Sequence, residues 1–249
     1  MSNSTALPTS NPARRPISYA NHEEETYIRF LWDAFKTNCS AEKYEFANLA
    51  FHLLYMSFVC FSVWQIRAAR RADFDKAMVG FQSEVENKLA SADTPFKFFE
   101  NLKESAIFRF IKLVGCNNEQ VGEFSKFVKQ RNRIAHPSGT VFFNSKENID
   151  NQIEQVMVEI EHIQQHMTPV LHDCLHAFLE ENADQDGWEY SLPKDQINAG
   201  LIHTYYFSRK DIDACLAFDI SAFDGHADAG PIRELFATFR ETYKVEAEE

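Results

Sequence analysis

The sequence lacks the short motifs that identify several large classes of enzyme. It holds no glycine-rich phosphate-binding loop, no G-x-S-x-G nucleophile elbow, no dinucleotide-binding fingerprint and no internal repeat. These absences exclude a motif-based assignment to the P-loop nucleotide hydrolases, the α/β-hydrolases or the Rossmann dehydrogenases. Any chemistry therefore has to come from another arrangement of side chains.

Cysteine is scarce, and its positions show no pattern typical of metal binding. The chain has 5 cysteines, an odd number, and none of them belongs to a C-x-x-C pair. This pattern predicts free thiols in a reducing compartment and argues against a structural zinc site. The cysteines are Cys39, Cys60, Cys116, Cys174 and Cys215.

The beginning of the chain lacks an apolar run. Residues 1–20 contain several Ser, Asn and Pro and no apolar core of a secretory signal peptide. We therefore predict a disordered N-terminus over residues 1–20 and a cytoplasmic protein. The remainder is rich enough in apolar residues for a substantial core, with 45% hydrophobic residues and 23 Phe.

Positive charge is also in short supply. The chain has 25 Lys and Arg against 37 Asp and Glu, which gives a net charge of −12. Nucleic-acid-binding proteins normally show a basic footprint, so this balance does not point to them. Two clusters of positive residues nevertheless occur, and each fits either a local basic groove or a solvated helix face. The clusters are Lys126, Lys129, Arg131 and Arg133, and Arg67, Arg70 and Arg71.

Apolar residues recur at helical spacing along most of the chain, which predicts an all-α fold. Helix-capping and turn residues delimit the expected helices. They cover residues 21–38, 40–64, 73–90, 94–102, 107–114 and 117–136, and a long helix starts at Ser145 and ends near Asn182. A polar break at 184–187 then separates a helical domain, 21–182, from a small, mainly helical C-terminal extension, 183–249. In this extension we expect a short strand over 201–207 and helices starting at Ser208 and Gly230.

The segment 46–66 approaches the length and composition of a membrane span. Five polar residues interrupt it, which favours a buried central helix or a dimer interface, and no membrane. They are Asn48, His52, Ser57, Ser62 and Gln65. A membrane-anchored regulator is the alternative, and recovery in the soluble fraction without detergent would exclude it.

The long helix from Ser145 carries four histidines opposite its apolar stripe, in two pairs at i,i+4. Paired histidines of this kind can bind a metal ion. Pro169 separates the two pairs, and no Glu is placed as in H-E-x-x-H, so we predict no metal and no cofactor. The histidines, His162, His166, His172 and His176, are expected to face solvent or a partner.

The segment 126–137 contains the most informative residues. Arg131 falls inside the apolar stripe of its helix, where a Leu would be expected. Arginine cannot lose its proton and is costly to bury alone, so it should meet a carboxylate or line a cleft. His136 would point about 140° away from Arg131 in a regular helix. Pro137 disfavours helix at His136, so the imidazole can turn back towards Arg131.

The pattern Arg131-Asn132-Arg133-Ile134-Ala135-His136 resembles the R-N-x-x-x-H motif of ribonucleases of the HEPN superfamily, which are all-helical. The resemblance is specific only for the motif. Over 21–182 it extends only to the general helical character. It implies a HEPN-like bundle with long antiparallel helices. It further implies a metal-independent endoribonuclease that cleaves RNA by attack of the 2′-OH and leaves a 2′,3′-cyclic phosphate.

The resemblance also implies roles and partners. His136 would act as general acid or base and Arg131 would stabilise phosphoryl charge, which agrees with the ordinary chemistry of both side chains. Asn132 would orient the phosphate or Arg131, and Lys126, Lys129 and Arg133 are candidate RNA contacts. A homodimer would form a composite active site. Such proteins serve as toxins, in phage defence or in RNA processing, so an antitoxin or regulatory protein is a possible partner.

A second interpretation keeps the fold and drops the chemistry. In it, the chain is a non-catalytic helical dimerisation or interaction module, and Arg131 forms an ion pair at the dimer interface. Loss of dimerisation in Arg131→Ala, together with no RNA cleavage by the unmutated protein, would favour this second interpretation.

Overall fold

The computed structural model describes residue 19 and residues 22–135 and 144–244. The described part of the chain is all-α, as predicted, with one isolated β-bridge between Val79 and Phe81. Its first helices are α1 (His22–Ser40), α2 (Tyr44–Ala69), α3 (Arg71–Ala77), α4 (Ser83–Ala90), α5 (Phe96–Asn101) and α6 (Glu104–Ile107). The 3-10 helix η2 (Phe108–Val114), α7 (Asn118–Ala135) and α8 (Lys146–Glu181) follow. The C-terminal elements are η3 (Gln185–Gly187), α9 (Pro193–Ile197), η4 (Asn198–His203), α10 (Arg209–Leu216), η5 (Ile220–Phe223) and α11 (Ala229–Lys244).

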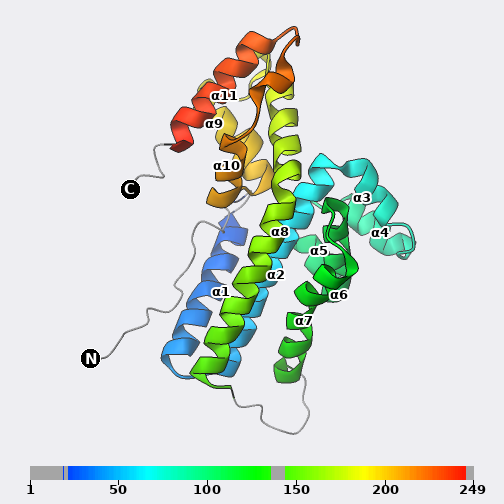
Figure 1. Ribbon diagram of the computed structural model, residues 1–249, viewed down its shortest axis with the longest axis vertical. Coiled ribbons are helices and arrows are strands. Elements are labelled where there is room, and N and C mark those ends of the chain that lie inside the picture. The colour runs from blue at the N-terminus through cyan, green and yellow to red at the C-terminus, as the bar shows by residue number, and fades with distance from the viewer. Residues whose placement is uncertain (1–18, 20–21, 136–143, 245–249) are drawn as a thin grey trace.

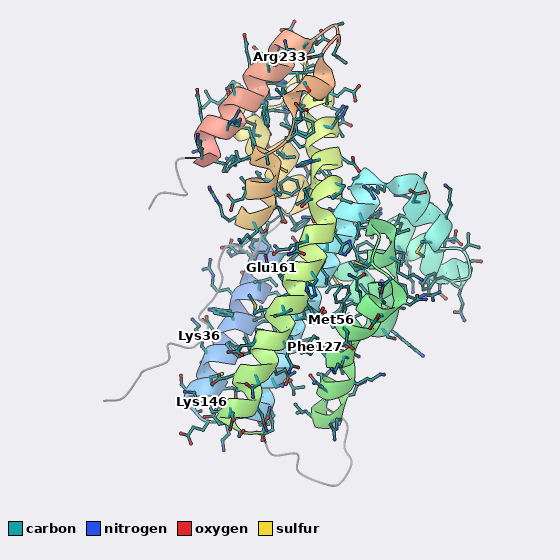
Figure 2. The ribbon with its side chains drawn as sticks, viewed as in Figure 1. Lys36, Met56, Phe127, Lys146, Glu161 and Arg233 are labelled. Carbon is teal, nitrogen blue, oxygen red and sulfur yellow. The ribbon has the colours of Figure 1, made fainter. Side chains whose placement is uncertain are left out.

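Three long helices, α1, α2 and α8, lie side by side and form the spine of the molecule (Figure 1). The chain reverses between α1 and α2, so these two helices are antiparallel, and α8 runs in the same direction as α2. The shorter helices α3 to α7 pack on one flank of α2, while α9, α10 and α11 gather around the second half of α8 (Figure 1). In Figure 2, Met56 of α2 and Phe127 of α7 lie in the middle of the molecule, where both side chains are buried.

Helix α2 is the central element, and its polar residues have partners inside the fold. Asn48 and Gln152 of α8 exchange hydrogen bonds, and Gln65 donates to the backbone oxygen of Tyr205 at 3.1 Å. The hydroxyls of Ser57 and Ser62 donate to backbone oxygens one turn earlier in α2. These pairs satisfy the polar groups that interrupt an otherwise apolar helix.

Among the described helices, α2 alone is long and apolar enough to cross a membrane, and 67% of its most apolar stretch is buried by the rest of the chain. Core helices of soluble proteins have the same properties.

Several predicted caps are confirmed. Asn117 Oδ1 accepts from the backbone of Gln120, and Gln120 Oε1 accepts from the backbone of Asn117, a reciprocal capping box at the start of α7. Ser145 caps α8 through Asn148, and the capping box of Ser208 and Asp211 opens α10. The predicted cap Ser40 is wrong because α2 starts later, after Lys43. The predicted cap at Asn21 lies outside the described residues.

Two predicted elements differ from the structure. The helix expected over 73–90 is two helices, α3 and α4, because the chain turns at Gly80 with φ of +100°. The strand expected over 201–207 is wrong, since η4 is a π-helix in which Leu201 and Ile202 are buried. A short apolar run has the same pattern in a buried strand and in a buried helix, so local sequence could not separate them.

The C-terminal extension shares a core with the helical domain. One continuous cluster of buried apolar side chains reaches from α2 through Leu175 and Leu179 of α8 to Ile232 and Phe239 of α11. Residues 183–244 therefore complete the core around the second half of α8.

The histidines of α8 lie differently from the prediction. His162 is exposed and lies 3.1 Å from Glu159, as expected for a solvent-facing residue. The other three contact elements of the same chain: His166 hydrogen-bonds Gln120, His172 the backbone oxygen of Ala214, and His176 stacks on Phe223. All three are half-buried, so the prediction that they face solvent or a partner holds only in part, because residues of α7, α10 and η5 contact that face of α8.

Candidate active site

Helix α7 carries most of the predicted site residues. Its first part is anchored in the core by Phe124, Phe127 and Val128, all buried. Towards its end α7 diverges from α8 (Figure 1), and Ala135 is exposed. Arg131 is half-buried and lies just before the last turn of α7.

Arg131 meets a carboxylate inside its own chain. Its Nη2 donates to Oε1 of Glu104, the first residue of α6. The other carboxylate oxygen of Glu104 lies 3.0 Å from Nε2 of His52 on α2. The side chains of His52, Glu104 and Arg131 are 1%, 11% and 22% exposed, so the carboxylate is shared between a buried imidazole and a guanidinium that solvent can reach.

The charges of this cluster are set by opposing effects. Burial raises the pKa of Glu104, but its hydrogen bonds and electrostatic interactions with His52 and Arg131 outweigh the effect of burial, and the pKa lies below its ordinary value. Glu104 therefore remains ionised at neutral pH. Two nitrogens of the cluster, Nδ1 of His52 and Nε of Arg131, are buried without a hydrogen-bond partner among the described residues.

Other predicted site residues lie around this cluster. Asn132 is half-buried next to Arg131, whereas Lys126, Lys129 and Arg133 are exposed on α7. Lys126 has an acidic neighbour, Glu123, at 3.4 Å. His136 and Pro137 directly follow α7 in sequence and lie outside the described residues, as does the predicted turn after them.

A cleft of about 310 Å³ runs beside the end of α7, between α7, α8 and the start of α2. Most of its lining side chains are carboxamides, which come from all three helices. They are Asn48, Gln130, Asn144, Asn148, Asn151, Gln152 and Gln155, of which Asn144 directly precedes Ser145, the cap of α8. Arg133 and Ile134 complete the lining. The cleft is therefore polar and nearly uncharged.

The second cluster of positive residues is engaged within the chain. Arg67 donates to the backbone oxygens of Ala90 and Ala92, both at 2.8 Å. Arg70 is paired with Asp173, and Arg71 with Asp75. Arg67 thus ties α2 to the end of α4, Arg70 ties the end of α2 to α8, and the pair of Arg71 lies within α3. All three cations have partners within the chain.

Sequence reasoning missed Glu104 and His52 as neighbours of Arg131. His52 carried a signal, since a histidine inside an otherwise apolar helix needs a buried partner. Glu104 carried none, because Arg131 and His52 lie 27 and 52 residues from it in sequence. Only the packing of α2, α6 and α7 brings the three together.

No metal site accompanies the cluster: the described residues hold no group of three His, Cys, Asp or Glu side chains placed to bind a metal ion. Comparison with known proteins finds no matching family model, no matching curated protein and no matching solved structure. The HEPN resemblance thus rests on the motif residues alone.

Proposed function

We propose that the chain is a metal-independent endoribonuclease of the HEPN type, and that the end of α7 carries its active site. One observation carries this proposal. Glu104 holds the guanidinium of Arg131 in place. Arg131 lies five residues before His136 in the sequence, and its neighbours Gln130 and Arg133 line a polar cleft. A positioned guanidinium and a nearby imidazole are the two groups that cleavage by a neighbouring 2′-OH requires.

In the proposed reaction, His136 moves the proton at the 2′-oxygen or at the leaving 5′-oxygen. Arg131 binds the phosphoryl oxygens on which negative charge develops, which a guanidinium does without a metal ion. The product is a 2′,3′-cyclic phosphate. Asn132 orients the phosphate, while Glu104 and His52 act as positioning residues because they contact Arg131 or its carboxylate partner.

The substrate would approach along the exposed side of α7. Lys126, Lys129 and Arg133 are exposed there and are proposed to contact the RNA backbone. The chain as a whole has a net charge of −12, so these local cations have to overcome a repulsive background. RNA binding is therefore expected to depend steeply on salt.

The proposal includes an assembly and a setting. A homodimer would join two α7 ends in a composite site, and an antitoxin or regulatory protein would control it. We place the protein in the cytoplasm without a membrane association, as a toxin or a phage-defence effector.

The central test is cleavage of total RNA by the purified protein in EDTA, beside His136→Ala and Arg131→Ala variants with unchanged circular dichroism. We expect cleavage by the unmutated protein and a loss of about 100-fold or more in each variant. Product ends are checked for the cyclic phosphate. No cleavage over a wide panel of RNAs, or cleavage that survives in His136→Ala, would reject the proposal.

Arg131→Lys separates chemistry from structure. Lys keeps a positive charge for Glu104 but not the planar fork of a guanidinium. In the nuclease, we expect Arg131→Lys to recover most of the stability lost in Arg131→Ala and little of the cleavage. Recovery of both together would mean that Arg131 acts mainly through the fold.

A second candidate function is the non-catalytic interaction module. It is favoured by the pair of Arg131 with Glu104, because a guanidinium neutralised within its own chain can be purely structural. The dimer-interface ion pair expected for Arg131 is thus replaced by a pair within the chain. Urea unfolding of Arg131→Ala, beside RNA cleavage by the unmutated protein, distinguishes the two functions. A loss of stability in the variant, with no RNA cleavage by the unmutated protein, would support the module.

A further inference from the structure

The carboxamide cleft has a chemistry that neither the predicted catalytic residues nor the ion-pair cluster explains. A carboxamide offers a donor and an acceptor side by side and carries no charge. Asn48 and Gln152 bind each other across the cleft and fix its floor. Asn151 and Gln155 are exposed on α8 and form no side-chain hydrogen bond within the described residues. Gln130 Oε1 is buried and has no hydrogen-bond partner in the described part of the chain.

The cleft adjoins the cluster around Arg131. Asn48 of the cleft and His52 of the cluster are four residues apart on α2, and side chains at this spacing are neighbours on one face of a helix. On α7, Gln130 and Ile134 line the cleft on either side of Arg131 in sequence. A ligand that extends from the cleft along these helix faces would therefore come close to the cluster of His52, Glu104 and Arg131.

We propose that this cleft binds one unpaired base of single-stranded RNA, next to the phosphate held by Arg131. This inference rests on the proposed function and adds the specificity of the same site. The neutral donor and acceptor groups match the edge of a base, and the cations of α7 match the backbone. A carboxamide makes two hydrogen bonds to adenine, so adenine is the expected base.

The structure of the cleft also requires that the bound RNA is single-stranded. Its lining comes from three helices, and the bases of a duplex are stacked and paired, out of reach of such a cleft. Sequence-specific recognition of RNA mostly uses single-stranded segments, whose bases can be turned outward. An extended peptide also has neutral donors and acceptors, but the anionic backbone of RNA fits Lys129 and Arg133 better.

The test measures binding in the absence of cleavage. The full chain with His136→Ala is titrated into fluorescent tetranucleotides of A, C, G or U and into an abasic tetramer, and anisotropy is recorded. The tetramer of A is expected to bind about tenfold more tightly than the abasic tetramer, the effect of one bidentate pair. In Asn151→Ala/Gln155→Ala this preference is expected to disappear, while the affinity for the abasic tetramer stays the same.

Gln165→Ala is the matched control, an exposed carboxamide on α8 outside the cleft, and it should keep the preference. Asn148→Ala is a second cleft variant if the double substitution alters the circular dichroism. Equal binding of all five oligonucleotides, or a preference that survives in the cleft variants, would overturn the inference. A base preference without any cleavage in EDTA would instead reject the proposed nuclease activity and support base binding in the cleft. Failure of one proposal is therefore distinguishable from failure of the other.

Discussion

Glu104 gives the clearest case of one residue that determines the properties of its surroundings. It shares one negative charge between Arg131, which is always positive, and His52, which is almost completely buried. Its lowered pKa keeps it ionised at neutral pH. Removal of the charge would leave the guanidinium without a counter-charge and would take away one of the two acceptor oxygens that face Arg131 and His52, and poorly paired buried polar groups are costly.

We predict that Glu104→Gln lowers the free energy of unfolding by about 1–3 kcal/mol at pH 7. The folded-state pKa of Glu104 lies below its ordinary value of 4.5, so its stabilising effect is complete above that pH and is lost as the pH falls further. The variant should therefore differ from the unmutated protein at pH 7 and much less at pH 3. Urea unfolding followed by circular dichroism measures both differences. Glu100→Gln, an exposed partner of Lys97, is the control and should have a small effect at either pH.

The cysteines support a second prediction at this scale. All five are unpaired and buried. Burial raises the pKa of Cys116 to about 11 and that of Cys60 and Cys174 further, so few thiolates exist at pH 8. We expect slow reaction with a disulfide reagent in the native protein and rapid reaction of five thiols after unfolding in urea. Rapid reaction of several thiols in the native state would contradict the described packing.

Among the elements, α7 is fixed by local sequence at its start, whereas η4 is fixed by its contacts with another helix. Helix α7 is started by the reciprocal cap of Asn117 and Gln120, which is a local device. The π-helix η4 is determined by its contacts. Gly200 lies so close to Phe178 of α8 that a Cβ at this position would come within 2.8 Å of the ring. A glycine is therefore needed where η4 meets α8.

We predict opposite effects of the same substitution in these two elements. Gly200→Ala should lower the free energy of unfolding by about 1–3 kcal/mol, because the methyl group overpacks the contact with Phe178. Gly122→Ala in α7 meets nothing within 4 Å and should raise the free energy of unfolding by about 0.5–1 kcal/mol, because alanine favours helix. Urea unfolding of both variants gives the comparison, and a stabilising Gly200→Ala would show that η4 can move away from α8.

At the scale of the whole molecule, the continuity of the core determines which parts can exist alone. The apolar side chains of α10 and α11 belong to the same buried cluster as those of α2 and α8. The second half of α8 is covered by these C-terminal helices (Figure 1). Without them, Leu175, Phe178 and Leu179 would lose part of their cover.

We predict that a chain ending at residue 182 does not fold to a stable, monodisperse protein. Exposure of a large apolar surface on α8 would cause aggregation or unfolding. Size-exclusion chromatography and thermal unfolding test this outcome, with a chain that lacks only residues 245–249 as the control. Cooperative unfolding of the short chain at the temperature of the full chain would show that the extension is an independent unit.

Local sequence was sufficient for the elements that local physics controls. The all-α class followed from helical spacing of apolar residues, and the buried stripe of α8, for example Ile153, Ile163 and Val170, appeared as expected. The caps at Asn117, Ser145 and Ser208 followed from side chains that bond backbone groups three residues away. The position of Arg131 on an apolar face also indicated that a carboxylate or a cleft would be close.

Tertiary structure decided the identity of that carboxylate and the helical state of 198–203. Glu104 meets Arg131 and His52 only because α6 and α7 pack on the same flank of α2, and long-range packing leaves no local pattern. The short apolar run at Leu201 and Ile202 fits a buried strand and a buried helix equally well. Packing against α8 therefore determined that the segment is helical. The carboxamide cleft arises in the same way, since its side chains come from three helices that are distant in sequence.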